Sequence, residues 1–198
     1  MVRRRRRLTT IAAMAVAAAV LLTGCTPAQS SPSATGSSAT GSSAPLPSID
    51  VAGLTPVGPL ERARLVRIVD GDTIVVDRGR GRETVRYIGI DTPETVRPST
   101  PVEFMGPEAT AANAALLGAR DLFLERDVSE TDRFDRLLRN VWVQDPAQPS
   151  GWLLVNLALV AGGWAQVSTF PPDVRYANDL LAAQATARDA GFGLWGDG

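Results

Sequence analysis

Alternating apolar and polar positions predict that the folded part of the chain begins with β-strands. In Leu60–Val69, Val66 and Ile68 alternate with their neighbours, which is typical of a strand. Two shorter apolar runs, Thr73–Val76 and Val85–Ile90, are separated by a connection rich in Gly and Arg. Such a pair of runs is typical of a β-hairpin. The pattern therefore predicts a strand followed by a hairpin.

The rest of the chain mixes helical and strand patterns. A helix is predicted to begin near Pro107, because the first turn of a helix tolerates the missing N–H of proline. Further elements are predicted as strands at Asp121–Val128, Leu137–Gln144 and Trp164–Val167, and as helices at Trp152–Ala161 and about Asp173–Ala190, with Gly191 ending the last one. Five of these strands with about three helices fit an α+β, mainly β fold, a small five-stranded Greek-key barrel. Periodicity alone does not distinguish it from other α+β barrels.

The N-terminal part has a different character. Arg3–Arg7 precede the twelve-residue apolar and small-residue run Ile11–Leu22, so residues 1–24 are predicted to be a secretory signal. A membrane span is the alternative, but it needs roughly 20 apolar residues. Residues 25–57 contain a Ser/Ala/Thr/Gly/Pro tract without periodicity and are predicted to form a flexible linker. Residues 58–198 are predicted to form one domain.

Composition excludes several kinds of site. The chain has no histidine, and its 20 basic residues are all arginine. Nucleases and hydrolases that use a histidine base, and histidine-ligated zinc sites, are therefore excluded. The single cysteine allows no internal disulfide and no cysteine metal cluster. Without residues 1–24, 15 arginines face 21 acidic residues, a net charge of −6, which argues against tight nucleic-acid binding through bulk charge.

Two acidic turns flank the predicted hairpin. Asp70 and Asp72 precede its first strand, and Asp91 and Glu94 follow its second. Folding of the hairpin could bring the turns together, and converging carboxylates repel each other unless a cation lies between them. Oxygen-only ligands favour Ca²⁺ or Mg²⁺ over softer metals. The alternative is that the acidic residues only form turns and bind no metal, because Asp-Gly is a common turn dipeptide.

Arg86 lies on the second strand of the hairpin, on the face shared by Thr84 and Ile88. A guanidinium on an apolar face needs an anion, supplied either by the protein or by a ligand. A cation beside an arginine is an arrangement that holds a phosphate. The alternative is that Arg86 simply pairs with a carboxylate of the protein.

These residues occur in an order and spacing that resemble the staphylococcal nuclease (thermonuclease) family. The matching segments are D-G-D-T at 70–73, Arg86, D-T-P-E at 91–94, G-P-E-A at 106–109, T-D-R-F-D-R at 131–136, F-P-P-D-V-R-Y at 170–176 and G-F-G-L-W at 191–195. The similarity extends from about Leu60 to Trp195. It implies an OB-fold-like barrel and Ca²⁺-dependent hydrolysis of DNA or RNA by in-line attack of water. The implied products end in 3′-phosphates.

The resemblance also implies roles for individual residues. The metal ligands would be Asp72, Asp91 and the carbonyl of Thr92, with Asp70 supporting the water shell. Arg86 and Arg136 would clamp the phosphate, and Glu94 would orient or deprotonate the attacking water. Arg133, Phe134 and Phe170 would contact the substrate. For Phe170 the alternative is a place in the core, and for Arg136 the alternative is a solvated charge cluster.

Asp135 stands where the family usually has glycine. If the position requires a positive φ, aspartate tolerates it better than most residues. Its charge, however, could draw Arg136 away from a phosphate. The sequence therefore predicts activity with weaker substrate binding.

The end of the apolar run, Leu22-Thr23-Gly24-Cys25, resembles the lipobox of bacterial lipoproteins. This implies lipidation of Cys25 and anchoring to the outer face of the cell membrane. We expect a monomer without a protein partner. Two other functions remain open at this stage: a non-catalytic nucleic-acid- or protein-binding module on the same barrel, and a lipoprotein that captures small solutes.

Overall fold

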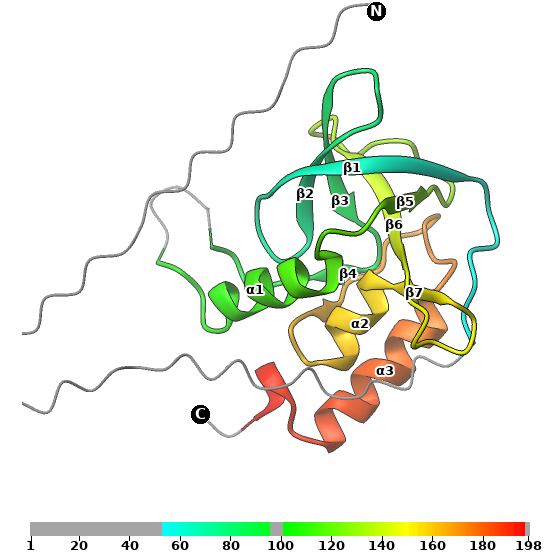
Figure 1. Ribbon diagram of the computed structural model, residues 1–198. Helices are drawn as coiled ribbons and strands as arrows, with labels where there is room; N and C mark the ends of the chain where they lie inside the picture. Colours follow the sequence, from blue (N-terminus) through cyan, green and yellow to red (C-terminus); the bar gives the residue numbers. More distant parts are fainter. Residues whose placement is uncertain (1–52, 96–100, 197–198) are drawn as a thin grey trace, which may run out of the picture. The chain divides into compact units, whose positions relative to one another are not determined.

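A ring of five strands forms the centre of the fold (Figure 1). The computed structural model describes residues 53–95 and 101–196; the predicted signal segment, Cys25 and most of the linker lie outside them. The strands are β1 (Leu60–Ile68), β2 (Thr73–Asp77), β3 (Arg82–Tyr87), β4 (Ile90–Asp91), β5 (Leu122–Glu125), β6 (Leu137–Gln144), β7 (Trp152–Leu154) and β8 (Gln166–Val167). The helices are α1 (Gly106–Leu117), α2 (Val155–Ala161), α3 (Ala177–Asp189) and the short 3₁₀ helix η1 (Gly193–Trp195).

The ring closes because β1 takes part in two pairings. Its first half pairs with β5 and its second half with β2, and a β-bulge between Leu65 and Arg67 interrupts the second pairing. Bulges bend a strand and increase its twist. On the other side β3 pairs with β6 in parallel, with Val85 opposite Leu137. The order is therefore β3-β2-β1-β5-β6, closed by β3–β6, as expected for the predicted OB-fold-like α+β fold.

The core fills the ring and continues beneath the helices. Ile74 and Val76 of β2 and Val85 of β3 are fully buried, as period-two alternation requires when one face of a sheet is covered. Trp142 of β6 packs edge-on against Tyr176, with ring centroids 5.7 Å apart. Figure 1 shows the three helices together on one side of the barrel. None of the helices in the described segments is long and apolar enough to cross a bilayer.

Several predicted elements are shorter in the structure: β5 and β8 cover only part of Asp121–Val128 and Trp164–Val167, and the last helix begins at Ala177. Two further differences change the strand pairing. Residues 152–154 were expected to begin a helix, but they form β7, which pairs with the end of β6. A continuous apolar run fits a buried strand as well as a buried helix, so its pattern could not separate the two. Likewise the second strand of the hairpin ends at Tyr87. Gly89 then adopts a φ of 80°, and the following Ile90–Asp91 pairs with β8 instead.

Candidate functional site

The two acidic turns lie against each other. The N–H of Thr92 donates to Asp72 Oδ2 at 2.8 Å, across 20 residues of sequence. Gly71 allows this close approach, because a Cβ at that position would lie 2.7 Å from Thr92 Oγ1. The turn before β2 and the turn at β4 therefore form one corner of the barrel, as the hairpin pattern indicated.

Arg86 joins these turns. Its Nη2 lies 2.7 Å from Asp91 Oδ1 and its Nε lies 3.2 Å from Asp72 Oδ1. Its Nη1 donates to the carbonyls of Tyr87 and Ile90, both at 2.8 Å. The side chain is 16% exposed, so its charge is largely enclosed by these partners. The anionic partners of Arg86 are therefore protein carboxylates, and they are the same two, Asp72 and Asp91, that were predicted to bind a metal.

Negative charge accumulates in this corner. Burial and, after it, the neighbouring Asp72 carboxylate raise the pKa of Asp70 to about 6, with a smaller contribution from Glu94. Burial also raises the pKa of Asp91, Arg86 lowers it, and Asp72 raises it again. These effects require Asp72 to lie close enough to repel both Asp70 and Asp91, and Glu94 close enough to repel Asp70.

The donor set fits a hard divalent cation. In residues 53–95 and 101–196, no three His, Cys, Asp or Glu side chains are arranged to hold a metal ion on their own. The predicted set requires only the two carboxylates of Asp72 and Asp91 and one backbone carbonyl, that of Thr92. Calcium accepts carboxylate, carbonyl and water oxygens in one coordination shell. Asp72 and Asp91 both contact the guanidinium of Arg86, so their carboxylate oxygens lie close together.

Helix α1 supports the first acidic turn through Asn113. Its side chain is fully buried; it accepts a hydrogen bond from the Tyr87 hydroxyl at 3.0 Å and donates to the carbonyl of Asp70 at 3.3 Å. The sequence prediction missed this residue. Its signal was a polar side chain within the apolar face of a predicted helix, where a buried amide needs partners.

Glu94 is held by the far end of the loop that follows it. The N–H of Glu94 donates to Glu103 Oε2 at 3.1 Å, and the N–H of Glu103 donates to the carbonyl of Glu94 at 3.0 Å. This reciprocal pair fixes the backbone of Glu94 beside the acidic corner. Glu103 was not among the predicted site residues, and the sequence carried no periodic signal for it.

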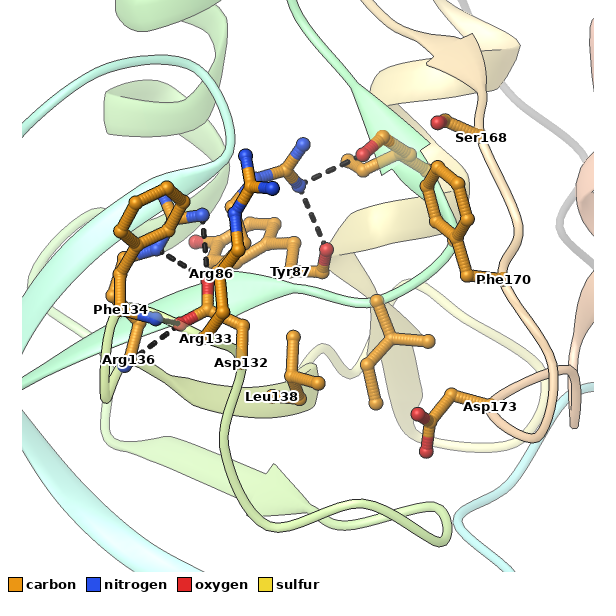
Figure 2. Close-up of a pocket in the computed structure, with 13 residues that line it drawn as sticks. Arg86, Tyr87, Asp132, Arg133, Phe134, Arg136, Leu138, Ser168, Phe170 and Asp173 are labelled. Atoms are coloured by element: carbon orange, nitrogen blue, oxygen red, sulfur yellow. Dashed lines mark hydrogen bonds and ion pairs between the residues drawn. The ribbon is translucent and has the colours of Figure 1, made fainter.

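A pocket of about 500 Å³ opens on the other side of Arg86. Arg86, Arg133, Phe134, Arg136 and Phe170 all line it. Figure 2 shows Phe134 and Phe170 on opposite sides of the pocket, with arginine side chains between them. Asp72, Asp91 and Glu94 do not line the pocket, so Arg86 is the residue that connects it with the acidic corner.

Arg136 is held by Asp132 and not by Asp135. Its Nη2 lies 2.6 Å from Asp132 Oδ2, and its Nε donates to the same oxygen at 2.7 Å. Asp132 Oδ1 accepts the backbone N–H groups of Phe134 and Arg136 and so closes the turn. Asp135 has a φ of 59°, as its place in a usual glycine position suggested, but its exposed side chain forms no ion pair with Arg136.

Two aromatic side chains of the pocket, Phe134 and Phe170, face solvent, whereas the third, Tyr87, is buried. Phe134 is 62% exposed and Phe170 is 74% exposed. The alternative that Phe170 belongs to the core is therefore wrong. Arg133 lies over the Phe134 ring at 4.6 Å from its centroid, and Arg136 lies at 5.5 Å. Exposed aromatic rings beside arginines provide stacking surfaces and positive charge together.

Comparison with known proteins agrees with the order of these motifs. Residues 84–197 match the family model described as staphylococcal nuclease homologue. The chain is 35% identical over 132 residues to a thermonuclease of Staphylococcus hyicus, covering 67% of this chain and 74% of that protein. It is 35% identical over 129 residues to a thermonuclease of Staphylococcus intermedius, covering 65% and 73%. It is 31% identical over 137 residues to the endonuclease YncB of Bacillus subtilis, covering 69% and 62%.

Proposed function

The chain belongs to the staphylococcal nuclease family. From this premise we propose that it is a Ca²⁺-dependent nuclease that binds the phosphodiester to be cleaved at Arg86. The observation that supports the proposal is that Arg86 belongs both to the pocket and to the acidic corner. This side chain lines the pocket and contacts both Asp72 and Asp91. A phosphodiester bound in the pocket would therefore lie next to the oxygens of the acidic corner.

The two arginines would bind the phosphate. A guanidinium presents several donors in one plane, so it can hold two phosphate oxygens at once. Arg86 already contacts two carboxylates, and a phosphate would replace one of them as an anionic partner. Two donor atoms of Arg136 are engaged by Asp132, which leaves the rest of its guanidinium available to the pocket. Such preorganised charge stabilises the additional negative charge of the transition state.

Asp72, Asp91 and the carbonyl of Thr92 would hold the calcium ion. When bound, Ca²⁺ would supply Lewis-acid polarisation of the phosphate and offset the repulsion among these oxygens. Asp70 accepts the N–H of Asp72 at 3.1 Å and so fixes the first turn for this task. Thr92, whose N–H is bonded to Asp72, is fixed in the same way.

Glu94 would act on the attacking water. Its carboxylate would accept a hydrogen bond from that water and orient it, or take its proton, as a general base does. The reciprocal hydrogen bonds with Glu103 hold its backbone in place for this role. Cleavage of the bond to the 5′-oxygen would leave a 3′-phosphate on the product, from either DNA or RNA.

The nuclease interpretation is preferred over a binding module because every residue needed for hydrolysis is present. Asp72, Asp91 and Glu94 remain at the corner, and Arg86 and Arg136 remain at the pocket. Lipidation of Cys25 would place the nuclease on the outer face of the membrane, with residues 26–57 as its tether. This localisation rests on the sequence of residues 1–25.

Removal of the metal tests the metal assignment. We expect the purified protein to degrade single-stranded DNA in the presence of Ca²⁺ and to lose that activity when a chelator of Ca²⁺ is added. Activity should return when excess Ca²⁺ is restored, because the oxygens that hold the ion belong to the folded barrel. Digestion that continues at the same rate in the chelator would contradict the calcium assignment.

A further inference from the structure

Strand register places four arginines on one outer face of the barrel. In β2, Ile74 and Val76 point into the core, so Thr73, Val75 and Asp77 lie on the opposite face of the strand, where Thr73 and Val75 are themselves covered. Directly paired residues share a face of a sheet. The residues on this face of β2 are paired with arginines on both neighbouring strands: Arg86 and Arg82 on β3, and Arg67 and Arg64 on β1. We refer to these four arginines as the basic strip.

Within the described segments, acidic neighbours pair with only two of the four arginines of the basic strip, and one of these is Arg86, which contacts Asp72 and Asp91. Arg64 pairs with Asp77 at 3.3 Å, and Asp77 also accepts the N–H of Gly79. Arg67 and Arg82 are both exposed, and neither has a carboxylate partner within residues 53–95 and 101–196. Exposed and unpaired arginines on a domain of net negative charge form a local positive surface, which attracts anions.

The basic strip is continuous with the pocket. Arg82 lies four residues before Arg86 on the same strand and the same face, which corresponds to about 13 Å along β3. Arg67 lies across β2 from this strand. Figure 1 shows the β2–β3 hairpin on the side of the barrel away from the three helices. Along β2 the register places Arg86 level with Thr73, Arg67 level with Val75 and Arg82 level with Asp77. A chain of phosphates that begins at Arg86 would therefore run along β2, between Arg67 on one side and Arg82 on the other.

We propose that Arg67 and Arg82 form a phosphate-binding track for the part of a nucleic-acid strand that extends beyond the cleavage site. The proposal rests on the proposed function, because it places the bond to be cut at Arg86. The track would contact the backbone and not the bases, since guanidinium groups on a strand face bind phosphates without reading sequence. It would raise the affinity for long strands and leave the cleavage of short ones unchanged.

The test compares two double variants of the full-length protein with the same net charge. Arg67→Gln/Arg82→Gln removes the track. The control Arg120→Gln/Arg188→Gln removes two charges from the helical side, where Arg120 bonds the α1 carbonyl of Leu116 and Arg188 stacks on Trp195. Binding of a labelled long oligothymidylate is measured by fluorescence anisotropy at about 50 and 200 mM salt. A Glu94→Gln background without added Ca²⁺ keeps cleavage slow during this measurement.

Loss of two phosphate contacts should reduce the slope of log K against log salt by about 1.4, from about 0.7 for each contact on a single strand. We expect roughly tenfold weaker binding of the track variant at the lower salt, and an unchanged rate on a thymidine dinucleotide when Glu94 is intact. Equal affinities and slopes for the track and control variants would overturn the proposal. If the track variant binds the oligothymidylate more weakly than the control but the wild-type protein cleaves neither substrate, the proposed function is wrong and the phosphate-binding track is still supported.

Discussion

The Glu94→Gln variant is expected to lower kcat by about 10²–10⁴-fold, the usual contribution of a general base. Glutamine keeps the size of the side chain but cannot accept a proton from water. The backbone hydrogen bonds between Glu94 and Glu103 do not involve the substituted carboxylate, so the fold should persist. The measurement is steady-state cleavage of single-stranded DNA in Ca²⁺, together with the far-UV circular dichroism spectrum.

A matched control separates the chemistry from a change of charge. Glu108 is exposed in the first turn of α1, and Glu108→Gln removes the same negative charge without touching the acidic corner. Its kcat should remain close to that of the wild-type protein. A Glu94→Gln variant with at least half of the wild-type kcat would show that Glu94 does not act on the attacking water.

The Arg86→Gln variant is expected to lower kcat/KM by about 10²–10³-fold, in the range found when one donor that stabilises a transition state is removed. Two effects combine here. The phosphate loses its guanidinium, and Asp72 and Asp91 lose the cation that separates them in the free protein. The measurement is kcat/KM on a thymidine dinucleotide, which reaches only the pocket.

Arg82→Gln serves as the control for Arg86, because the two arginines lie on the same face of β3. On the dinucleotide, Arg82→Gln should cleave at the wild-type rate. Arg86→Lys adds a second comparison: it retains the charge but not the planar donor group, so it should recover only part of the lost activity. Full activity in Arg86→Lys would show that charge alone is required at this position.

The acidic corner could be predicted from sequence because its parts are local. Asp70 and Asp72 adjoin one strand of the hairpin and Asp91 follows the other within four residues, so the turn chemistry and the hairpin together bring them close. The closing of the barrel could not be predicted in the same way. It depends on the β3–β6 pairing and on the bulge in β1, and strand pairing between distant segments leaves no trace in the period of either segment.

The partners of the site residues were harder to predict than the residues themselves. The sequence drew attention to Asp135 as the charge most able to disturb Arg136, because it replaces the usual glycine. In the structure Asp132 holds Arg136, since the turn directs its carboxylate back toward both the backbone and the guanidinium of residue 136. Asp135 adopts the positive φ and points to solvent. Backbone direction within a tight turn decides this, and residue type alone does not.

The most direct measurement is a crystal structure of the protein with Ca²⁺ and a non-hydrolysable thymidine dinucleotide. We predict a cation held by the carboxylates of Asp72 and Asp91 and by the carbonyl of Thr92, with the phosphate contacted by Arg86 and Arg136. A phosphate bound away from Arg86, or a cation held without Asp72 and Asp91, would contradict the account.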